Sequence, residues 1–173
     1  TMPEHYNIFK SISPIVTLGE HSFSVGILFL MMLGFYVFMV SMGAKPLLSM
    51  IAALAYALGS YNIIIIAVGH ITKAWAMAMI APILGGMILV FRRKWLAGAV
   101  MFTLSLGLQI GFNHIQITYY TMLAAFILGL CYLIYAIKEK TIKDFALGGG
   151  MLVLCAAIAF LPNSSHFKLN SEY

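Results

Sequence analysis

Two short polar segments between apolar runs hold the side chains best suited to chemistry. In the first, Gly69-His70-Ile71-Thr72-Lys73, an imidazole and an ammonium lie three residues apart. Such a pair suits a phosphate, because Lys73 offers a positive charge and His70 can donate a hydrogen bond or pass a proton to a leaving oxygen. In the alternative interpretation, Lys73 extends to lipid head groups and His70 caps the turn.

The second segment, Asn113-His114-Ile115-Gln116, joins two apolar runs, and Gln109 precedes it by about one helical turn. Polar side chains at a membrane edge are costly unless they pair, face water or hold a ligand. The sequence therefore predicts one binding site built on both segments. Its substrate-binding residues are Lys73, His70, Asn113, His114 and Gln116. The alternative is that mutual hydrogen bonds among the polar side chains staple the second hairpin.

A metal site is the next possibility, because five histidines and three carboxylates fall on one predicted side of the chain. They are His5, His21, His70, His114, His166, Glu4, Glu20 and Glu172. No HxH, HxxH or HExxH spacing occurs among them, so the sequence predicts no cofactor and gives a divalent metal no support. The catalytic residue stays unassigned, with Glu4, Glu20 and His70 as the candidates.

The composition requires a membrane around these segments. Hydrophobic residues make up 62% of the 173 residues, charged residues only 9%, and the mean hydropathy is +0.99. Such a chain cannot solvate the surface of a globule, so its outer surface faces lipid. The formal net charge of +5 does not indicate nucleic acid, because the cations sit in short loops rather than on one continuous face.

The apolar runs fit a span length of about 20 residues per helix. They predict an all-α, polytopic transmembrane bundle of about six spanning helices with an N-terminal interfacial segment. The expected spans are 23–42, 47–67, 74–91, 95–112, 117–137 and 145–162. Residues 1–22 would be the end of an extracytoplasmic loop with a short interfacial helix, 23–162 the transmembrane region, and 163–173 the start of an extracytoplasmic segment.

Successive loops lie on alternate sides of the predicted bundle, and the two sides differ in positive charge, which orients the bundle. Seven of the ten cations would share one side: Lys45, Arg92, Arg93, Lys94, Lys138, Lys140 and Lys143. The excess of Lys and Arg makes this side cytoplasmic. Both histidine-bearing turns are then extracytoplasmic.

Special residues inside the spans carry further expectations. Pro82 should bend the third span and free a backbone carbonyl, which more often shapes packing than serves a function. Gly85, Gly86 and the run Gly148–Gly150 should let helices approach closely. Cys131 and Cys155 fall in separate spans and are expected to be unpaired packing residues.

The chain also resembles a known family at both polar turns. The strings that carry the resemblance are Gly69-His70-Ile71-Thr72-Lys73-Ala74, Arg93-Lys94-Trp95-Leu96-Ala97-Gly98, Leu106-Gly107-Leu108-Gln109-Ile110 and Asn113-His114-Ile115-Gln116-Ile117-Thr118-Tyr119-Tyr120. They resemble the YfhO-like family of large bacterial membrane proteins, over nearly the whole chain but only part of a typical member. Ile71 departs from the polar residue common there, which argues against a ligand beside His70.

The resemblance implies an internal part of a GT-C-type glycosyltransferase in the bacterial cytoplasmic membrane. Such an enzyme moves a sugar from a polyprenyl-phosphate carrier to an acceptor outside the cytoplasm. Its catalytic acidic residue, a general base, usually lies in the first outer loop. Glu4 and Glu20 would then be substitutes for a residue upstream of Thr1. The implied partners are membrane lipid, the lipid-linked sugar and flanking parts of the same larger protein, and the isolated segment is expected to be inactive.

Two other classes of function stay open. A transporter or flippase predicts polar or charged groups near the bilayer midplane and inverted repeats, and neither stands out in the sequence. A non-catalytic assembly subunit would use the two outer turns only to hold helices together. Mutation of those turns would then lower stability without changing any catalytic rate.

The predicted topology can be tested by labelling single cysteines placed at Thr72 and Lys94 in a chain that lacks Cys131 and Cys155. A membrane-impermeant maleimide should label intact cells at position 72, and position 94 only after permeabilisation, because the positive-inside rule puts these turns on opposite sides. Labelling of both positions from one compartment would refute the arrangement.

Overall fold

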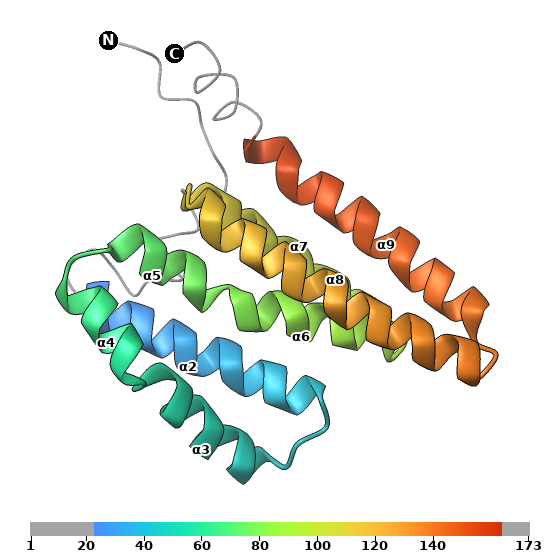
Figure 1. The fold of residues 1–173 in the computed structure, drawn as a ribbon, viewed down its shortest axis with the longest axis horizontal. Coiled ribbons are helices and arrows are strands. Elements are labelled where there is room, and N and C mark those ends of the chain that lie inside the picture. The colour runs from blue at the N-terminus through green and yellow to red at the C-terminus, as the bar shows by residue number, and fades with distance from the viewer. Residues whose placement is uncertain (1–22, 164–173) are drawn as a thin grey trace.

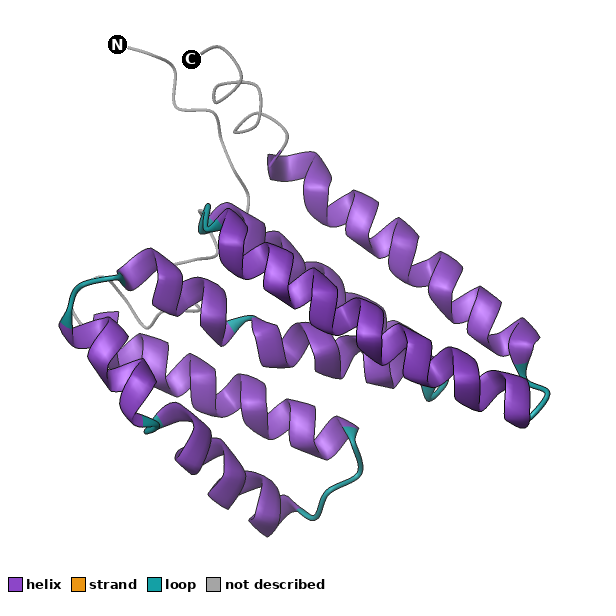
Figure 2. Cartoon of the chain, viewed as in Figure 1, coloured by secondary structure: helices purple, strands orange, loops and turns teal. Residues whose placement is uncertain are grey.

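The computed structural model describes residues 23–163, and every regular element in that range is a helix (Figure 2). This confirms the predicted all-α fold class. The elements are α2 (Phe23–Ser41), α3 (Pro46–Ala57), α4 (Ser60–Ala67), α5 (Ile71–Ala78), α6 (Ile80–Phe91), α7 (Trp95–Gly111), α8 (Ile115–Lys138), α9 (Ile142–Phe160) and the short 3-10 helix η2 (Leu161–Asn163).

The six predicted apolar segments all form helices, but only some meet the length and composition of a membrane span. Four do so in the described range: α2, α5 with α6 as one span of 21 residues, α8 and α9. The predicted span 47–67 consists of two helices, α3 and α4, which meet the length and composition of a span together and join at a 43° bend. Gly59 lies at this bend with φ −54° and ψ 137°, and these extended backbone angles end the run of helical residues. Helix α7 is shorter, with 17 residues.

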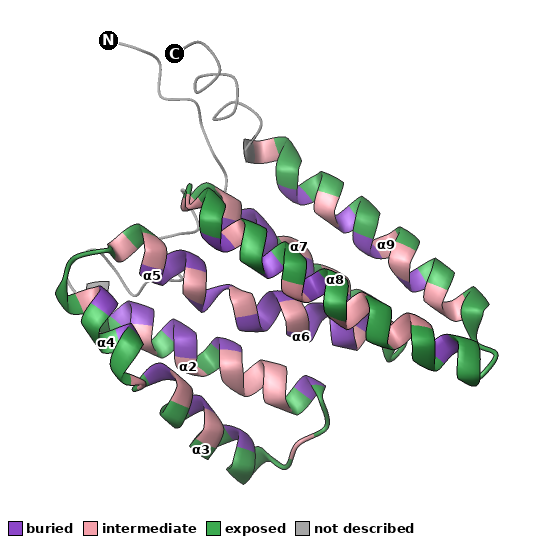
Figure 3. Cartoon of the chain, viewed as in Figure 1, coloured by how far each residue is buried: buried purple, intermediate pink, exposed green. Residues whose placement is uncertain are grey.

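The helices lie side by side in a row with the α5–α6 span near its centre (Figure 1). Along the row α3 packs on α2, α2 on α6, α6 on α7, and α7 on α9. In the central span, 78% of the most apolar 18-residue window is buried, whereas in α8 only 11% of the corresponding window is buried (Figure 3). The central span is rich in alanine and glycine, and small residues allow neighbours to approach it closely on both sides.

The hairpin turns share one feature, a residue with positive φ just after the helix end. Five turn residues have positive φ: Gly43, Gly69, Arg93, Asn113 and Lys140. In the α6–α7 turn, for example, Arg93 N donates to Val90 O at 2.9 Å and Lys94 N donates to Leu89 O at 2.9 Å. These are the two bonds of a Schellman motif, which satisfies carbonyls that a helix end would leave open. In a membrane this closure matters, because lipid offers the backbone no hydrogen bonds.

The short turns place the polar segments at alternate ends of the row. The α4–α5 and α7–α8 turns lie at one end, and the α2–α3, α6–α7 and α8–α9 turns lie at the other (Figure 1). The predicted separation of the two histidine turns from the basic turns is therefore confirmed.

The closest helix contact joins α6 and α7 at two glycines. A β-carbon on Gly98 would lie 2.7 Å from Val90 N and 2.8 Å from Gly86 O, and one on Gly86 would lie 2.8 Å from Phe102 N. The contacts are to backbone atoms, so no side chain can move aside. The expectation of close approach is confirmed at Gly86 but is wrong at Gly149 and Gly150, where a β-carbon would meet nothing within 4 Å.

Substitution of Gly98 by alanine tests this crossing. Gly98→Ala should lower the free energy of unfolding in detergent by about 1–3 kcal/mol, because the new methyl group forces α6 and α7 apart. Gly149→Ala is the matched control in an open helical position and should be neutral or stabilising by about 0.5–1 kcal/mol. Thermal unfolding of both variants checks this, and equal midpoints would contradict the proposed crossing.

Candidate functional site

The two histidine turns are joined by a pair of stacked rings. Trp75 in α5 and Phe112 at the end of α7 stack with centroids 5.6 Å apart and planes at 19°. Trp75 follows His70 by about one helical turn, and Phe112 immediately precedes Asn113. The structure thus brings the ends of α5 and α7 together, as a site built on both turns requires.

Lys73 lies on the α4 side of this end. Its Nζ is 5.6 Å from the centroid of the Tyr61 ring, a cation–π contact that fixes the direction of a half-buried side chain. No hydrogen bond or ion pair of Lys73 is found within residues 23–163. The ammonium therefore keeps its three N–H donors for an anion.

His70 is exposed at the start of α5 and does not cap the helix with its side chain. Its backbone carbonyl accepts the Ala74 N–H at 3.0 Å. The alternative in which the His70 imidazole caps the turn is therefore wrong. The ring remains available to a ligand at this end.

The polar residues of the second turn do not hydrogen-bond to one another. Asn113 is exposed with φ 53°, and Gln116 Nε2 donates instead to the Tyr120 hydroxyl one turn along α8, at 3.4 Å. His114 begins α8, and its Nδ1 is buried with no hydrogen-bond partner within the described range. The mutual staple among Asn113, His114 and Gln116 is thus absent from the described part of the chain.

The stapling role falls to Gln109, which is fully buried. Its Nε2 donates to Ala76 O at 2.9 Å and to Thr121 Oγ1 at 3.0 Å, while the Thr121 hydroxyl donates to Ile117 O at 2.8 Å. The amide nitrogen must face Ala76, because a carbonyl oxygen only accepts. One side chain therefore ties α5, α7 and α8 together.

The carbonyl that Gln109 meets lies beside the break between α5 and α6. The helical hydrogen-bond ladder breaks at Met79, and Met79 N donates to Ala76 O at 3.3 Å. Pro82 lies in the first turn of α6, and its missing N–H leaves the carbonyl of Ala78, four residues earlier, without its usual donor. Gln109 was expected to be a polar residue of this hairpin, but its partner Thr121 was not predicted. The available signal was a hydroxyl residue in the neighbouring helix α8.

Two buried polar atoms stay without a partner within residues 23–163: Oε1 of Gln109 and Nδ1 of His114. Both belong to the α7–α8 hairpin. An unsatisfied buried polar atom costs about 1–3 kcal/mol, so native proteins keep few of them. The pair marks the α7–α8 hairpin as the place where a polar ligand would find an acceptor and an imidazole nitrogen.

The remaining sequence candidates lie elsewhere. Glu4, Glu20 and the proposed interfacial helix fall outside the described residues, together with His5, His21 and His166. Within 23–163, no group of three or more His, Cys, Asp or Glu side chains is placed to hold a metal ion. Cys131 is exposed, Cys155 is buried and both are free, as expected.

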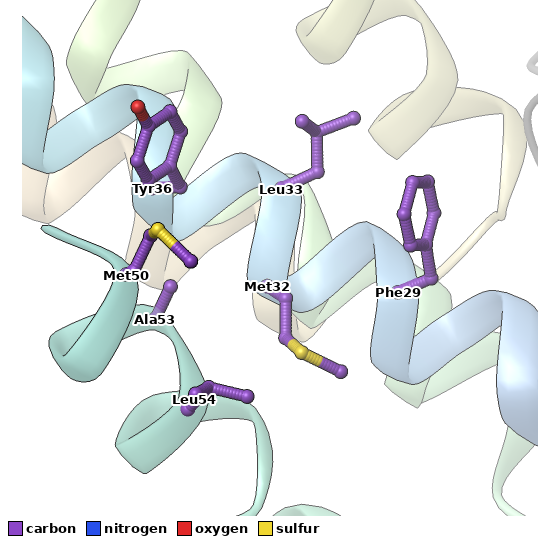
Figure 4. A pocket seen from close by; sticks show the side chains of 7 residues that line it. All are labelled: Phe29, Met32, Leu33, Tyr36, Met50, Ala53 and Leu54. Atoms are coloured by element: carbon purple, nitrogen blue, oxygen red, sulfur yellow. The ribbon is translucent and has the colours of Figure 1, made fainter. Parts of the chain in front are cut away.

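An apolar pocket between α2 and α3 offers no reactive group. It has a volume of about 310 Å³ and is lined by Phe29, Met32, Leu33, Tyr36, Met50, Ala53 and Leu54. Among the side chains drawn in Figure 4, the Tyr36 hydroxyl is the only oxygen. Its lining suits hydrocarbon, and it takes no part in the candidate site.

Comparison with protein-family profiles, with characterised proteins and with solved structures finds no match to this chain. A function can therefore be inferred only from the geometry of the two turns and from the resemblance of their residues to the YfhO-like family.

A double-mutant cycle tests the buried amide network. Gln109→Met and Thr121→Val remove the two ends of one hydrogen bond, and their coupling energy should be about 1 kcal/mol, within the range measured for bonds between membrane helices. The exposed pair Gln116→Met and Tyr120→Phe is the control, with coupling below about 0.5 kcal/mol because water competes for that bond. Unfolding of the four single and two double variants provides the energies; similar coupling in both cycles would contradict the network.

Proposed function

We propose that this chain is part of a membrane glycosyltransferase that moves a sugar from a polyprenyl-phosphate donor to an extracytoplasmic acceptor. The observation that carries the proposal is the Trp75–Phe112 stack, which gathers the two turns at one end. These turns are also the segments whose residues resemble the YfhO-like family. Geometry and resemblance thus point to the same few side chains.

The chemical role assigned to these side chains is to stabilise charge on the departing lipid phosphate. Lys73 and His70 donate to the phosphate oxygens, and fixed donors at a site of developing negative charge lower the barrier. Asn113, His114 and Gln116 order the same end of the bundle. The acceptor hydroxyl needs a carboxylate base, supplied by Glu4, Glu20 or another part of a larger protein.

The same proposal fixes the orientation. The end with Arg92, Arg93 and Lys94 faces the cytoplasm by the positive-inside rule, and the histidine turns face outward. This places the chain in the cytoplasmic membrane of a bacterium, with its site at the level of the outer head groups.

A transporter or flippase is the second candidate, and one feature favours it. Two spans are interrupted, α3–α4 by a 43° bend and α5–α6 at Met79, and discontinuous helices often build transport sites. Against it, the Asp, Glu, Lys and Arg side chains of residues 23–163 all lie in turns or at helix ends. A transport path usually needs such groups near the midplane.

An assembly subunit is favoured by the exposure of α8 and α9. Their span windows are only 11% and 22% buried, so most of their apolar surface is open to lipid or to another protein. In that role the two turns would affect stability alone.

Sugar transfer from a polyprenyl-phosphate-linked donor, measured with the natural full-length protein, separates these functions. Lys73→Ala and His114→Ala should each lower kcat/KM by about 10- to 100-fold, because the first removes a phosphate donor and the second removes a side chain that orders the site. Lys143→Ala, at the basic end, is the matched control and should keep its rate.

Unfolding midpoints of the same variants complete the test. Unchanged transfer in Lys73→Ala and His114→Ala would remove both residues from the mechanism. Lower stability with an unchanged rate would support the assembly role, and transport of the lipid-linked donor without sugar release would support a flippase.

A further inference from the structure

The basic end of the bundle holds a cavity with a different chemistry from the outer turns. It has a volume of about 540 Å³ and is lined by Phe91, Arg92, Cys131, Tyr132 and Tyr135. The first two residues come from the end of α6 and the others from the last two turns of α8. A guanidinium and two phenol hydroxyls therefore share one opening between helices.

Arg92 is held in place before any ligand arrives. Its Nη1 donates to Ser41 O at 2.7 Å, at the carboxyl end of α2. A cation at this end of a helix is favoured by the helix dipole. Gly43 leaves the room that the guanidinium occupies, since a β-carbon there would lie 3.2 Å from Nη1.

No carboxylate in the described range neutralises Arg92. Asp144 pairs with the neighbouring Arg93, and Glu139 is exposed at the end of α8, outside the cavity lining. The end as a whole carries seven cations against these two acids. Arg92 thus keeps guanidinium N–H donors for an external anion.

The Tyr132 ring is also fixed. Phe91 stacks on Tyr132 with centroids 4.7 Å apart, and it also stacks on Phe145 at 5.3 Å. The stack orients Tyr132 beside Arg92. Tyrosine hydroxyls at this depth, close to Lys138, lie at the level of lipid phosphates in a spanning bundle.

Toward its middle, α8 also carries an exposed apolar track. Phe126, Ile127, Leu130 and Ile134 are exposed, with 65%, 55%, 42% and 55% of their surfaces accessible. Acyl chains can lie along such a surface, whereas a free phosphate ion would gain nothing from it. The combination of head-group donors and track fits a lipid.

We propose that this cavity binds the phosphate of an anionic phospholipid, with Arg92 and the Tyr132 and Tyr135 hydroxyls as donors and the acyl chains along α8. Basic pockets between helices on one face of a membrane are suited to such head groups. The site is at the opposite end from the turns assigned to sugar transfer, and it does not depend on that assignment.

Lipid retention by the purified natural protein, measured by native mass spectrometry with phosphatidylglycerol or phosphatidylcholine, tests the proposal. The wild-type protein should prefer phosphatidylglycerol, and Tyr132→Phe with Tyr135→Phe should weaken its binding by about tenfold while keeping both rings. Arg92→Gln should weaken it at least as much. Arg93→Gln, whose cation is paired and outside the cavity, should stay within about twofold of wild type.

Three results would overturn the proposal. They are equal retention of both lipids, equal loss in Arg93→Gln and in the tyrosine variant, and release of phosphatidylglycerol by inorganic phosphate at concentrations that leave other lipid contacts intact. The last would assign the site to a soluble phosphate. Thermal unfolding of each variant without added lipid guards against loss of fold, because the tyrosine variant should match the wild-type midpoint and still lose the lipid.

Discussion

The contact of α6 with α7 at Gly86 and Gly98 is the constraint on which the rest of the structure depends. Lipid is as apolar as the helix surfaces, so helices in a membrane gain little from burying apolar side chains and must instead pack closely. At this crossing backbone atoms of one helix lie so close to the glycines of the other that a β-carbon would not fit. The direction of α7 relative to the central span follows from it.

That direction decides what the two ends of α7 can reach. Toward one end, Gln109 comes within 2.9 Å of the Ala76 carbonyl beside the helix interruption, and Phe112 stacks on Trp75. At the other end, α9 packs on α7, and its Asp144 pairs with Arg93. The central span thus serves as the common support for two separate clusters of polar side chains.

The two clusters differ in how their polar groups are satisfied. At the histidine end, Gln109 and His114 each keep one buried atom without a partner in the described range, and the Lys73 ammonium has only an aromatic ring beside it. At the basic end, Arg92 closes the end of α2 and stays uncompensated by a carboxylate. At each end a cation, Lys73 or Arg92, therefore keeps N–H donors for an anion.

Span length and charge are local properties of a chain, so the helical class, the positions of the apolar segments and the separation of histidine turns from basic turns could be predicted from the residues alone. The sequence did not determine the bend between α3 and α4, the partner of Gln109 or the cavity at Arg92. The hydrogen bonds of Gln109 and Arg92 join residues 12 to 51 positions apart. The bend depends on the backbone angles of a single residue, Gly59. Only the packing of α2, α6, α7 and α8 brings such atoms together, and apolar composition alone does not encode which helices are neighbours.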